Sequence, residues 1–305
     1  MMSRKDIELL HPKYWLTWFG LGVLWLLVQM PYPWIVKLGR FLGTRSRVFL
    51  KRRESIARRN LRLCFPNMSD ERIEQLIADN FKSLGMGLLE TGMGWFWSDN
   101  RLRKYFEIDG KDRFLAAQQH HRGVMLVGVH FMSLELCGRI MGLCQPILAT
   151  YRPHNNALME RVQTWGRSRS LKGMIDRKNL RAVITSLKKE EVVWFAPDQD
   201  YGPKGSIFTP FFAVEKAATT KGPLVLSRLS NAVMMTMTLT RKSNNSGYCL
   251  HFGTEFKQLP EEEAEASAYV NHAIEAEIMR APEQYLWVHR RFKTRPIGEP
   301  SLYGA

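Results

Sequence analysis

Residues 123–136 read GVMLVGVHFMSLEL, in which seven apolar residues lead directly into His130, followed by Ser133 and Glu135. A run this short and this continuously apolar is typical of a strand buried on both faces of a sheet. Helical patterns near residues 155–171 and 215–230 alternate with such runs. The alternation predicts an α/β fold with a largely parallel sheet flanked by helices. The further runs of this kind are QPILATY (145–151), EVVWFAP (191–197) and AVMMTMTLT (232–240).

Polar residues directly after these runs are the first candidates for chemistry, because open α/β sheets bind ligands beyond the carboxyl ends of their strands. If the first strand ends at His130 and Ser133 caps the next helix, Glu135 in the first helical turn could reach back to the imidazole. A histidine oriented by a carboxylate is a general base for a hydroxyl group. We therefore predict a catalytic pair of His130 and Glu135. A purely structural histidine is the alternative.

Charged residues also follow the second and third runs. Arg152 begins an arginine cluster that includes Arg161, and such residues hold phosphate or carboxylate groups or form ordinary surface ion pairs. Asp198 and Asp200 follow the third run, where they could position substrate hydroxyls, although a turn has the same composition. The predicted substrate-binding residues are Arg152, Arg167, Arg169, Asp198 and Asp200.

No cofactor or metal is predicted from sequence motifs. The chain has no phosphate-binding glycine loop, dinucleotide fingerprint or hydrolase elbow at a place where it could work. Its four cysteines have neither zinc-ligand spacing nor the pattern of a disulfide framework. With these motifs absent, the reaction type that we predict is metal-free attack by a substrate hydroxyl, assisted by a base.

The charge balance points to an acidic partner. The 305 residues contain 44 Lys and Arg against 29 Asp and Glu, a formal net charge of +15. Nucleic acid, an anionic membrane, and an acidic protein or phosphorylated substrate all fit this excess. Residues 37–62 hold ten basic residues against the single acid Glu54, and residues 289–296 (HRRFKTRP) form a smaller basic segment. We interpret the latter as a solvated tail or part of an acidic-partner surface.

Residues 14–36 contain no charge and carry tryptophans near both ends, which predicts an uncleaved membrane anchor. Pro31 and Pro33 shorten the uninterrupted helix, so a helix lying in one leaflet is the alternative to a spanning one. The adjacent basic block places the rest of the chain in the cytoplasm and disfavours nucleic acid as the partner. The predicted organisation is a tail (1–13), an anchor (14–36) and one cytosolic domain (37–305).

A long helix is predicted over residues 69–97. Ser69 is a suitable N-cap, and apolar residues follow it at helical spacing. Four glycines in the second half alternate with methionine and aromatic residues. They favour close packing between helices over a ligand tunnel. These glycines are Gly85, Gly87, Gly92 and Gly94.

Several strings together resemble the late, or secondary, acyltransferases of lipid A biosynthesis in Gram-negative bacteria. The resemblance covers nearly the whole chain and is nearer to the palmitoleoyl branch of that family than to the lauroyl branch. The strings are HPKYWLTWFGLGVLWLLVQMPYPW (11–34), KRRESIARRNLRLCFP (51–66), LVGVHFMSLEL (126–136), YRPHNN (151–156), WFAPDQDYGPKG (194–205) and APEQYLWVHRRFKTRP (281–296).

The resemblance implies a glycerolipid-acyltransferase-like fold and transfer of an acyl chain from acyl-(acyl-carrier protein) to a 3-hydroxyl of Kdo2-lipid IV(A) at the inner membrane. The family's H-x4-D/E motif falls on His130 and Glu135. The F-P-E-G-type block of the wider glycerolipid acyltransferase superfamily has no recognisable counterpart in this sequence. Two alternatives are a glycerolipid acyltransferase with another acceptor and a membrane-anchored binding protein without enzymatic activity.

Overall fold

The computed structural model describes residues 7–304 and contains the predicted parallel sheet. Seven strands lie in the order β1-β9-β8-β2-β5-β3-β4, and every neighbouring pair is parallel except β8 and β9. The strands of the sheet are β1 (Phe106–Asp109), β2 (Val124–Gly128), β3 (Leu148–Tyr151), β4 (Gly173–Asp176), β5 (Val192–Phe195), β8 (Val233–Arg241) and β9 (Tyr248–Glu255). All five residues of β2 are buried, as its apolar run predicts.

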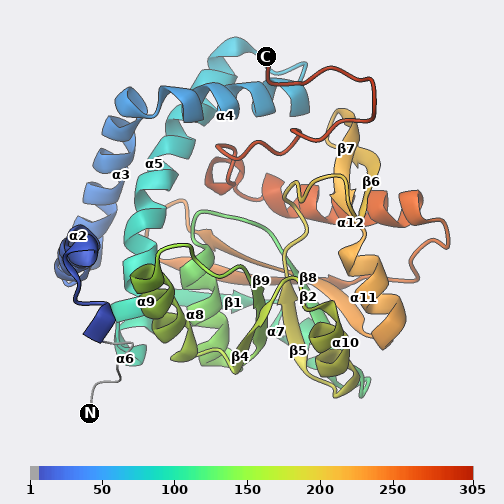
Figure 1. Ribbon diagram of the computed structural model, residues 1–305, viewed down its shortest axis with the longest axis horizontal. Helices are drawn as coiled ribbons and strands as arrows, with labels where there is room; N and C mark the ends of the chain where they lie inside the picture. Colours follow the sequence, from blue (N-terminus) through green and yellow to red (C-terminus); the bar gives the residue numbers. More distant parts are fainter. Residues whose placement is uncertain (1–6, 305) are drawn as a thin grey trace.

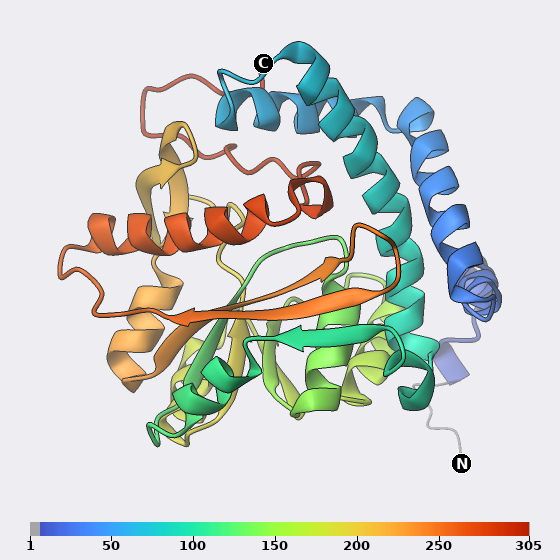
Figure 2. The same cartoon turned by 180° about the vertical axis from the view of Figure 1, so that it is seen from behind.

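Helices cover both faces of the sheet. Helices α8, α9 and α10 lie over the face presented in Figure 1, and α7 lies over part of the reverse face in Figure 2. The α-helices are α2 (Trp15–Leu27), α3 (Tyr32–Phe49), α4 (Lys51–Cys64), α5 (Asp70–Phe96), α6 (Asp99–Leu102), α7 (Lys111–Gln118), α8 (Leu134–Cys144), α9 (Ala157–Ser168), α10 (Leu180–Lys188), α11 (Gly222–Ser230) and α12 (Glu263–Met279). Two short 3₁₀ helices are η1 (Pro12–Tyr14) and η2 (Pro282–Gln284).

The helix predicted near residues 215–230 is only half correct. Its first part belongs to an antiparallel hairpin of β6 (Ser206–Phe211) and β7 (Val214–Thr220), and the helix α11 starts at Gly222. The segment VEKAATT alternates too weakly to reveal a strand on its own, and its pairing with β6 decides the conformation.

The long helix α5 confirms the prediction over residues 69–97. Ser69 Oγ accepts a hydrogen bond from the Arg72 backbone amide at 3.3 Å and caps the helix. Helix α3 packs beside α5 along one side of the molecule (Figure 1). A β-carbon added to Gly85 would lie 2.1 Å from the Gly39 carbonyl oxygen, so this contact requires glycine. The glycines therefore serve close helix packing, as predicted.

The predicted membrane anchor over residues 14–36 does not form one continuous helix. Helix α2 ends at Leu27, the chain turns, and Pro31 caps α3, which starts at Tyr32. Proline removes a backbone donor and fixes φ, so a helix starts readily after it but does not run through it. No helix within residues 7–304 is both long enough and apolar enough to cross a bilayer. The described residues therefore give no support to the spanning helix that the sequence predicted.

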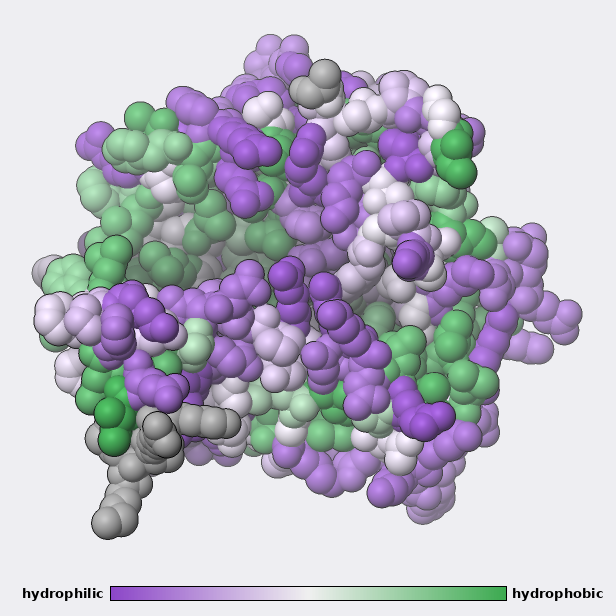
Figure 3. Space-filling view, viewed as in Figure 1, coloured by the Kyte–Doolittle hydropathy of each residue, from purple (hydrophilic) through white to green (hydrophobic). Residues whose placement is uncertain are grey.

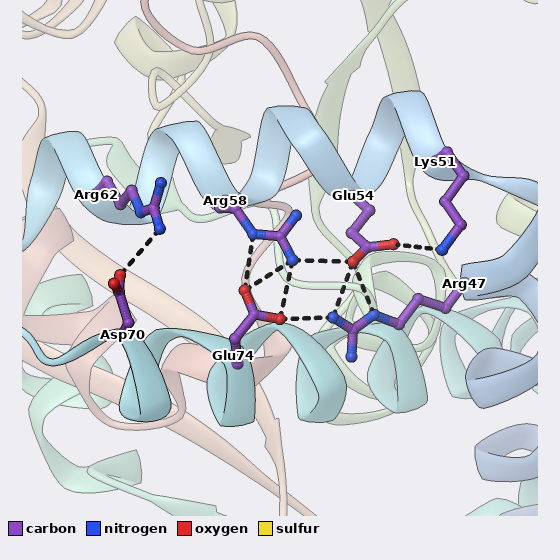
Figure 4. A network of polar contacts seen from close by, with 7 residues as sticks. All are labelled: Arg47, Lys51, Glu54, Arg58, Arg62, Asp70 and Glu74. Atoms are coloured by element: carbon purple, nitrogen blue, oxygen red, sulfur yellow. Dashed lines mark hydrogen bonds and ion pairs between the residues drawn. The ribbon is translucent and has the colours of Figure 1, made fainter.

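Ion pairs neutralise part of the basic block at residues 37–62. Figure 4 shows Arg47 and Arg58 on either side of the carboxylates of Glu54 and Glu74, which connect α3, α4 and α5. Glu54 is 6% exposed, and both arginines approach it within 3.0 Å. This part of the block holds three helices together.

The basic segment at residues 289–296 is not a solvated tail, which was one of its two interpretations, but part of a C-terminal segment (282–296) that packs against the fold. Arg291 is 3% exposed, donates to the Ala218 carbonyl oxygen at 2.7 Å and lies over the Phe211 ring. Asn60 of α4 and Asn80 of α5 each donate to two backbone carbonyls of this segment. The segment is therefore fixed against the helices at the carboxyl ends of the central strands.

Candidate active site

Neighbouring strands bring His130 and Asp198 together. Strands β2 and β5 are parallel, and Val124 stands opposite Val192. His130 lies six residues beyond Val124, and Asp198 lies six residues beyond Val192, so the two residues keep the register of the ladder after both strands have ended. The meeting point is the carboxyl end of the sheet, where ligands of open α/β sheets bind.

His130 and Asp198 form a tightly hydrogen-bonded dyad. Nδ1 of His130 lies 2.6 Å from Oδ1 of Asp198, and the His130 backbone amide donates to Oδ2 at 2.9 Å. Burial works to raise the pKa of Asp198, but the facing His130 and its hydrogen bonds outweigh burial, so the pKa is lowered. Asp198 is therefore a carboxylate that accepts a hydrogen bond from Nδ1–H of His130. Nε2 remains as the ring nitrogen that can take a proton from a substrate.

Surrounding residues fix the position of this dyad. The indole of Trp194 lies 6.3 Å from the imidazole, centroid to centroid, and a β-carbon on Gly128 would lie 2.1 Å from its Nε1 atom. From the C-terminal segment, the Leu286 backbone amide donates to the His130 carbonyl oxygen at 3.1 Å. The hydroxyl of Tyr285 donates to the Asp198 carbonyl oxygen at 3.3 Å. Both members of the dyad are thus held by their backbones.

The predicted contact between Glu135 and His130 is wrong. Both carboxylate oxygens of Glu135 bind elsewhere: Arg167 approaches them at 2.5 and 3.1 Å, and Trp95 and Gln163 donate to them at 3.1 Å. Burial raises the pKa of Glu135, but Arg167 and these donors lower it overall. The first turn of α8 points Glu135 toward α5 and α9, while the imidazole turns toward β5. Sequence spacing alone does not reveal this divergence.

Glu135 and Arg167 still belong to the same site as His130, because all three line one cavity. The cavity encloses about 240 Å³ between β3, β5, α5, α8 and α9. A water molecule occupies about 30 Å³ in the liquid, so several atoms of a ligand fit. Its lining residues are Gly94, Trp95, His130, Leu134, Glu135, Cys137, Gly138, Arg139, Ile147, Ala149, Thr150, Tyr151, Arg152, Gly166, Arg167, Leu171, Trp194 and Met237.

The cavity runs along β3 and is lined by both polar and apolar side chains. The lining residues extend from Arg152, just after β3, to Ile147, just before it. Five residues of extended strand span about 16 Å. Leu171 lies near Ile147, because the next residue, Lys172, donates from its backbone to the Ile147 carbonyl oxygen, and Arg167 lies close by because its carbonyl oxygen accepts from the Leu171 amide. A reactive group at His130 with an apolar tail along the apolar side chains of this lining fits the cavity.

The remaining predicted site residues divide into two groups. Arg152 lines the cavity, and its guanidinium makes no hydrogen bond or ion pair with residues 7–304. Arg169 instead donates to the Trp95 and Trp97 carbonyl oxygens at the end of α5. The carboxylate of Asp200 accepts hydrogen bonds from Gly202 and Thr294 and fixes the C-terminal segment. Arg169 and Asp200 therefore act in the framework and do not line the cavity.

Sequence reasoning did not assign Asp198 to His130, and it missed Trp95 and Gln163 beside Glu135. The equal offset of His130 and Asp198 from their strand starts is a signal, but it becomes useful only once β2 and β5 are known to be neighbours. Nothing in the sequence links Trp95 to Glu135. Within residues 7–304, no three His, Cys, Asp or Glu side chains are grouped as metal ligands would be.

Comparisons with known proteins show the family of this chain. Residues 2–294 match the model of the bacterial lipid A biosynthesis acyltransferase family. The chain is 66% identical to the lipid A biosynthesis palmitoleoyltransferase of Escherichia coli K12 over 97% of each chain. It is 51% identical to the lauroyltransferase of the same organism over 99% of each chain, and 23% identical to its myristoyltransferase. This chain therefore belongs to the family of bacterial lipid A biosynthesis acyltransferases and is an acyltransferase.

Proposed function

We propose that this enzyme transfers a palmitoleoyl chain from acyl-(acyl-carrier protein) to a 3-hydroxyl of a hydroxyacyl chain of Kdo2-lipid IV(A). The observation that carries the proposal is the His130–Asp198 dyad, whose imidazole lines a cavity that also has apolar side chains in its wall. Higher identity to the palmitoleoyltransferase (66%) than to the lauroyltransferase (51%) favours the palmitoleoyl chain.

The dyad activates the acceptor hydroxyl. Nε2 of His130 takes the hydroxyl proton as the oxygen attacks the thioester carbonyl carbon, and Asp198 stabilises the imidazolium that forms. Collapse of the tetrahedral oxyanion breaks the carbon–sulfur bond and leaves the new ester. The departing carrier thiolate then takes the proton back from the imidazolium. No oxidant, reductant or further reactant is required.

Glu135 and Arg167 shape the site next to the dyad. Their ion pair connects α8 to α9 and directs the Arg167 guanidinium over the Tyr151 ring beside the cavity. Arg152, whose guanidinium has no partner within residues 7–304, then binds an anionic group of the acceptor, a phosphate or a Kdo carboxylate. We assign Glu135 to positioning and Arg152 to substrate binding.

Helices α2 and α3 hold the enzyme on the cytoplasmic face of the inner membrane without spanning it. Their outer faces expose large apolar side chains, and Figure 3 shows hydrophobic residues gathered on this side of the molecule. The exposed basic residues Lys37, Arg40 and Arg45 on α3 suit anionic headgroups. The exposed apolar residues are Trp15, Leu16, Trp18, Phe19, Val23, Trp25, Leu26, Trp34, Phe41, Val48 and Phe49.

The proposal is tested with washed membranes containing the enzyme, supplied with Kdo2-lipid IV(A) and palmitoleoyl or lauroyl carrier-protein thioesters. Mass spectrometry of the products should show a single palmitoleoyl addition, which His130→Ala abolishes while the amount of folded protein is unchanged. Transfer to lysophosphatidic acid instead would identify a glycerolipid acyltransferase. Normal transfer by the His130→Ala variant would overturn the mechanism.

A further inference from the structure

Gly138 of α8 lies in the wall of the cavity. It is one helical turn after Leu134, about 6 Å farther along the axis, and both residues line the cavity. Helix α8 begins near His130 and ends at Cys144, so this step leads away from the dyad. The position of Gly138 therefore lies beside the path of any apolar tail whose reactive end meets His130.

Gly138 differs from the other two glycines of the cavity. A β-carbon on Gly166 would lie 2.4 Å from the Trp95 side chain, and one on Gly94 would lie 3.1 Å from the Glu135 carbonyl oxygen. Those two glycines permit close packing between helices. A β-carbon on Gly138 meets no atom within 4 Å, so the absence of a side chain there leaves open space. Helix packing does not explain the residue.

A glycine within an exposed or half-buried helix costs about 1 kcal/mol relative to alanine. Gly138 makes no close approach that would offset this cost, and its place in the cavity wall indicates a different reason for it. The apolar lining residues of the cavity include Cys137, Ile147, Leu171 and Met237, and the guanidinium of Arg139, which follows Gly138, is held by Asp99 and Ser170.

We infer that Gly138 determines the length of acyl chain that the enzyme accepts, because its missing side chain keeps the cavity open for the distal methylenes of the donor. The inference rests on the proposed acyl transfer and names the substrate feature that this site selects. A side chain at position 138 occupies the space of those methylenes and leaves the reacting carbonyl at His130 unaffected. One misfitting methylene in an apolar pocket changes specificity by about ten- to 200-fold.

The test compares Gly138→Ala, Gly138→Val and Gly138→Leu with the wild type, using decanoyl, lauroyl, myristoyl and palmitoleoyl carrier-protein thioesters. The ratio of kcat/KM for the longest accepted donor to that for a shorter donor should fall stepwise, by about tenfold or more for Gly138→Leu. The KM for the lipid acceptor should not change. Ala116→Leu is the control, because it places a leucine side chain at an exposed helix position on α7, away from the cavity.

The outcomes separate the inference from the proposed function. A wild type that transfers no chain from any donor contradicts the proposed function and the inference together. A wild type that transfers normally, with donor ratios unchanged across the Gly138 series, overturns the inference alone. Loss of folded protein in Gly138→Ala, measured by its detergent-extracted yield and melting temperature, also overturns it, because open space at this position must accommodate a methyl group.

Discussion

Nδ1 of His130 lies 2.6 Å from Oδ1 of Asp198, a residue 68 positions later in the chain, and Glu135, only five positions away, forms an ion pair with Arg167 instead. The offset of 68 is also the register offset of β2 and β5. The parallel sheet therefore selects the partner of the histidine. The carboxylate nearest in sequence is directed elsewhere by the helix on which it lies.

Asp198→Asn should lower kcat by roughly 10³-fold or more while the KM values change little. An amide at this position no longer enforces the Nδ1–H tautomer and cannot stabilise the imidazolium. Steady-state rates in detergent or washed membranes measure the effect. Turnover near that of the wild type, in protein with an unchanged melting temperature, would show that Asp198 does not assist His130.

Substitutions of Glu135 and Arg167 should have coupled effects on the free energy of unfolding. Glu135→Ala leaves the Arg167 guanidinium without its carboxylate partner, and we expect a loss of about 3 kcal/mol in the free energy of unfolding. The double variant Glu135→Ala/Arg167→Ala should lose less than the sum of the single variants. Urea unfolding of the detergent-solubilised protein gives the coupling energy. Strict additivity would mean that the two side chains act independently.

Arg152→Ala should raise the KM for the lipid acceptor by about tenfold and make that KM less dependent on salt, since a charged contact is lost. Arg152→Lys should restore part of the affinity. Arg181→Ala, which removes an exposed arginine of α10 outside the cavity, serves as the control. An unchanged acceptor KM in Arg152→Ala would remove this residue from the binding site.

Leu16→Glu combined with Phe19→Glu should weaken binding to vesicles by at least about tenfold, because each of these side chains contributes about 1.5–3 kcal/mol when buried in lipid. The two are 82% and 69% exposed on α2. Sedimentation with vesicles containing anionic lipid measures the partition. Leu180→Glu with Val225→Glu, two exposed apolar residues on α10 and α11, is the control. An equal loss of vesicle binding in the two double variants would contradict a membrane-binding face formed specifically by α2 and α3.

Glu54→Gln should destabilise the protein by about 1–3 kcal/mol near neutral pH. Burial works to raise the pKa of Glu54, but hydrogen bonds from Arg47 and Arg58 lower it from 4.5 to about 2. The folded state holds the carboxylate ionised at pH values where the unfolded state is protonated. The contribution to stability is therefore complete above about pH 4.5 and lost as the pH falls through about 2.

The measurement for this prediction is the difference in unfolding free energy between wild type and Glu54→Gln across that pH range, because other titrating groups are common to both proteins. The difference should shrink as the pH falls. Glu71→Gln, at an exposed position in the first turn of α5, should give a small effect. A Glu54 difference that stays constant down to pH 2 would contradict a charge-based role.

The sequence by itself determined the features that depend on local patterns. Buried apolar runs predicted the parallel sheet, Ser69 predicted the start of α5, and the glycines of α5 predicted close packing with another helix. The position of His130 after a buried strand predicted that this residue lies at the carboxyl end of the sheet. Each of these inferences uses interactions within about ten residues, or a rule common to all parallel sheets.

Only the tertiary structure decided which charged residues meet. Asp198 reaches His130 because β5 lies next to β2, and Glu135 turns to Arg167 because α9 packs against α8. The same applies to Arg291, which is buried under β7 although its neighbours in sequence are basic. Pairing of distant charges depends on strand order and helix packing, which are properties of the whole chain, and a local pattern of residue types does not contain them.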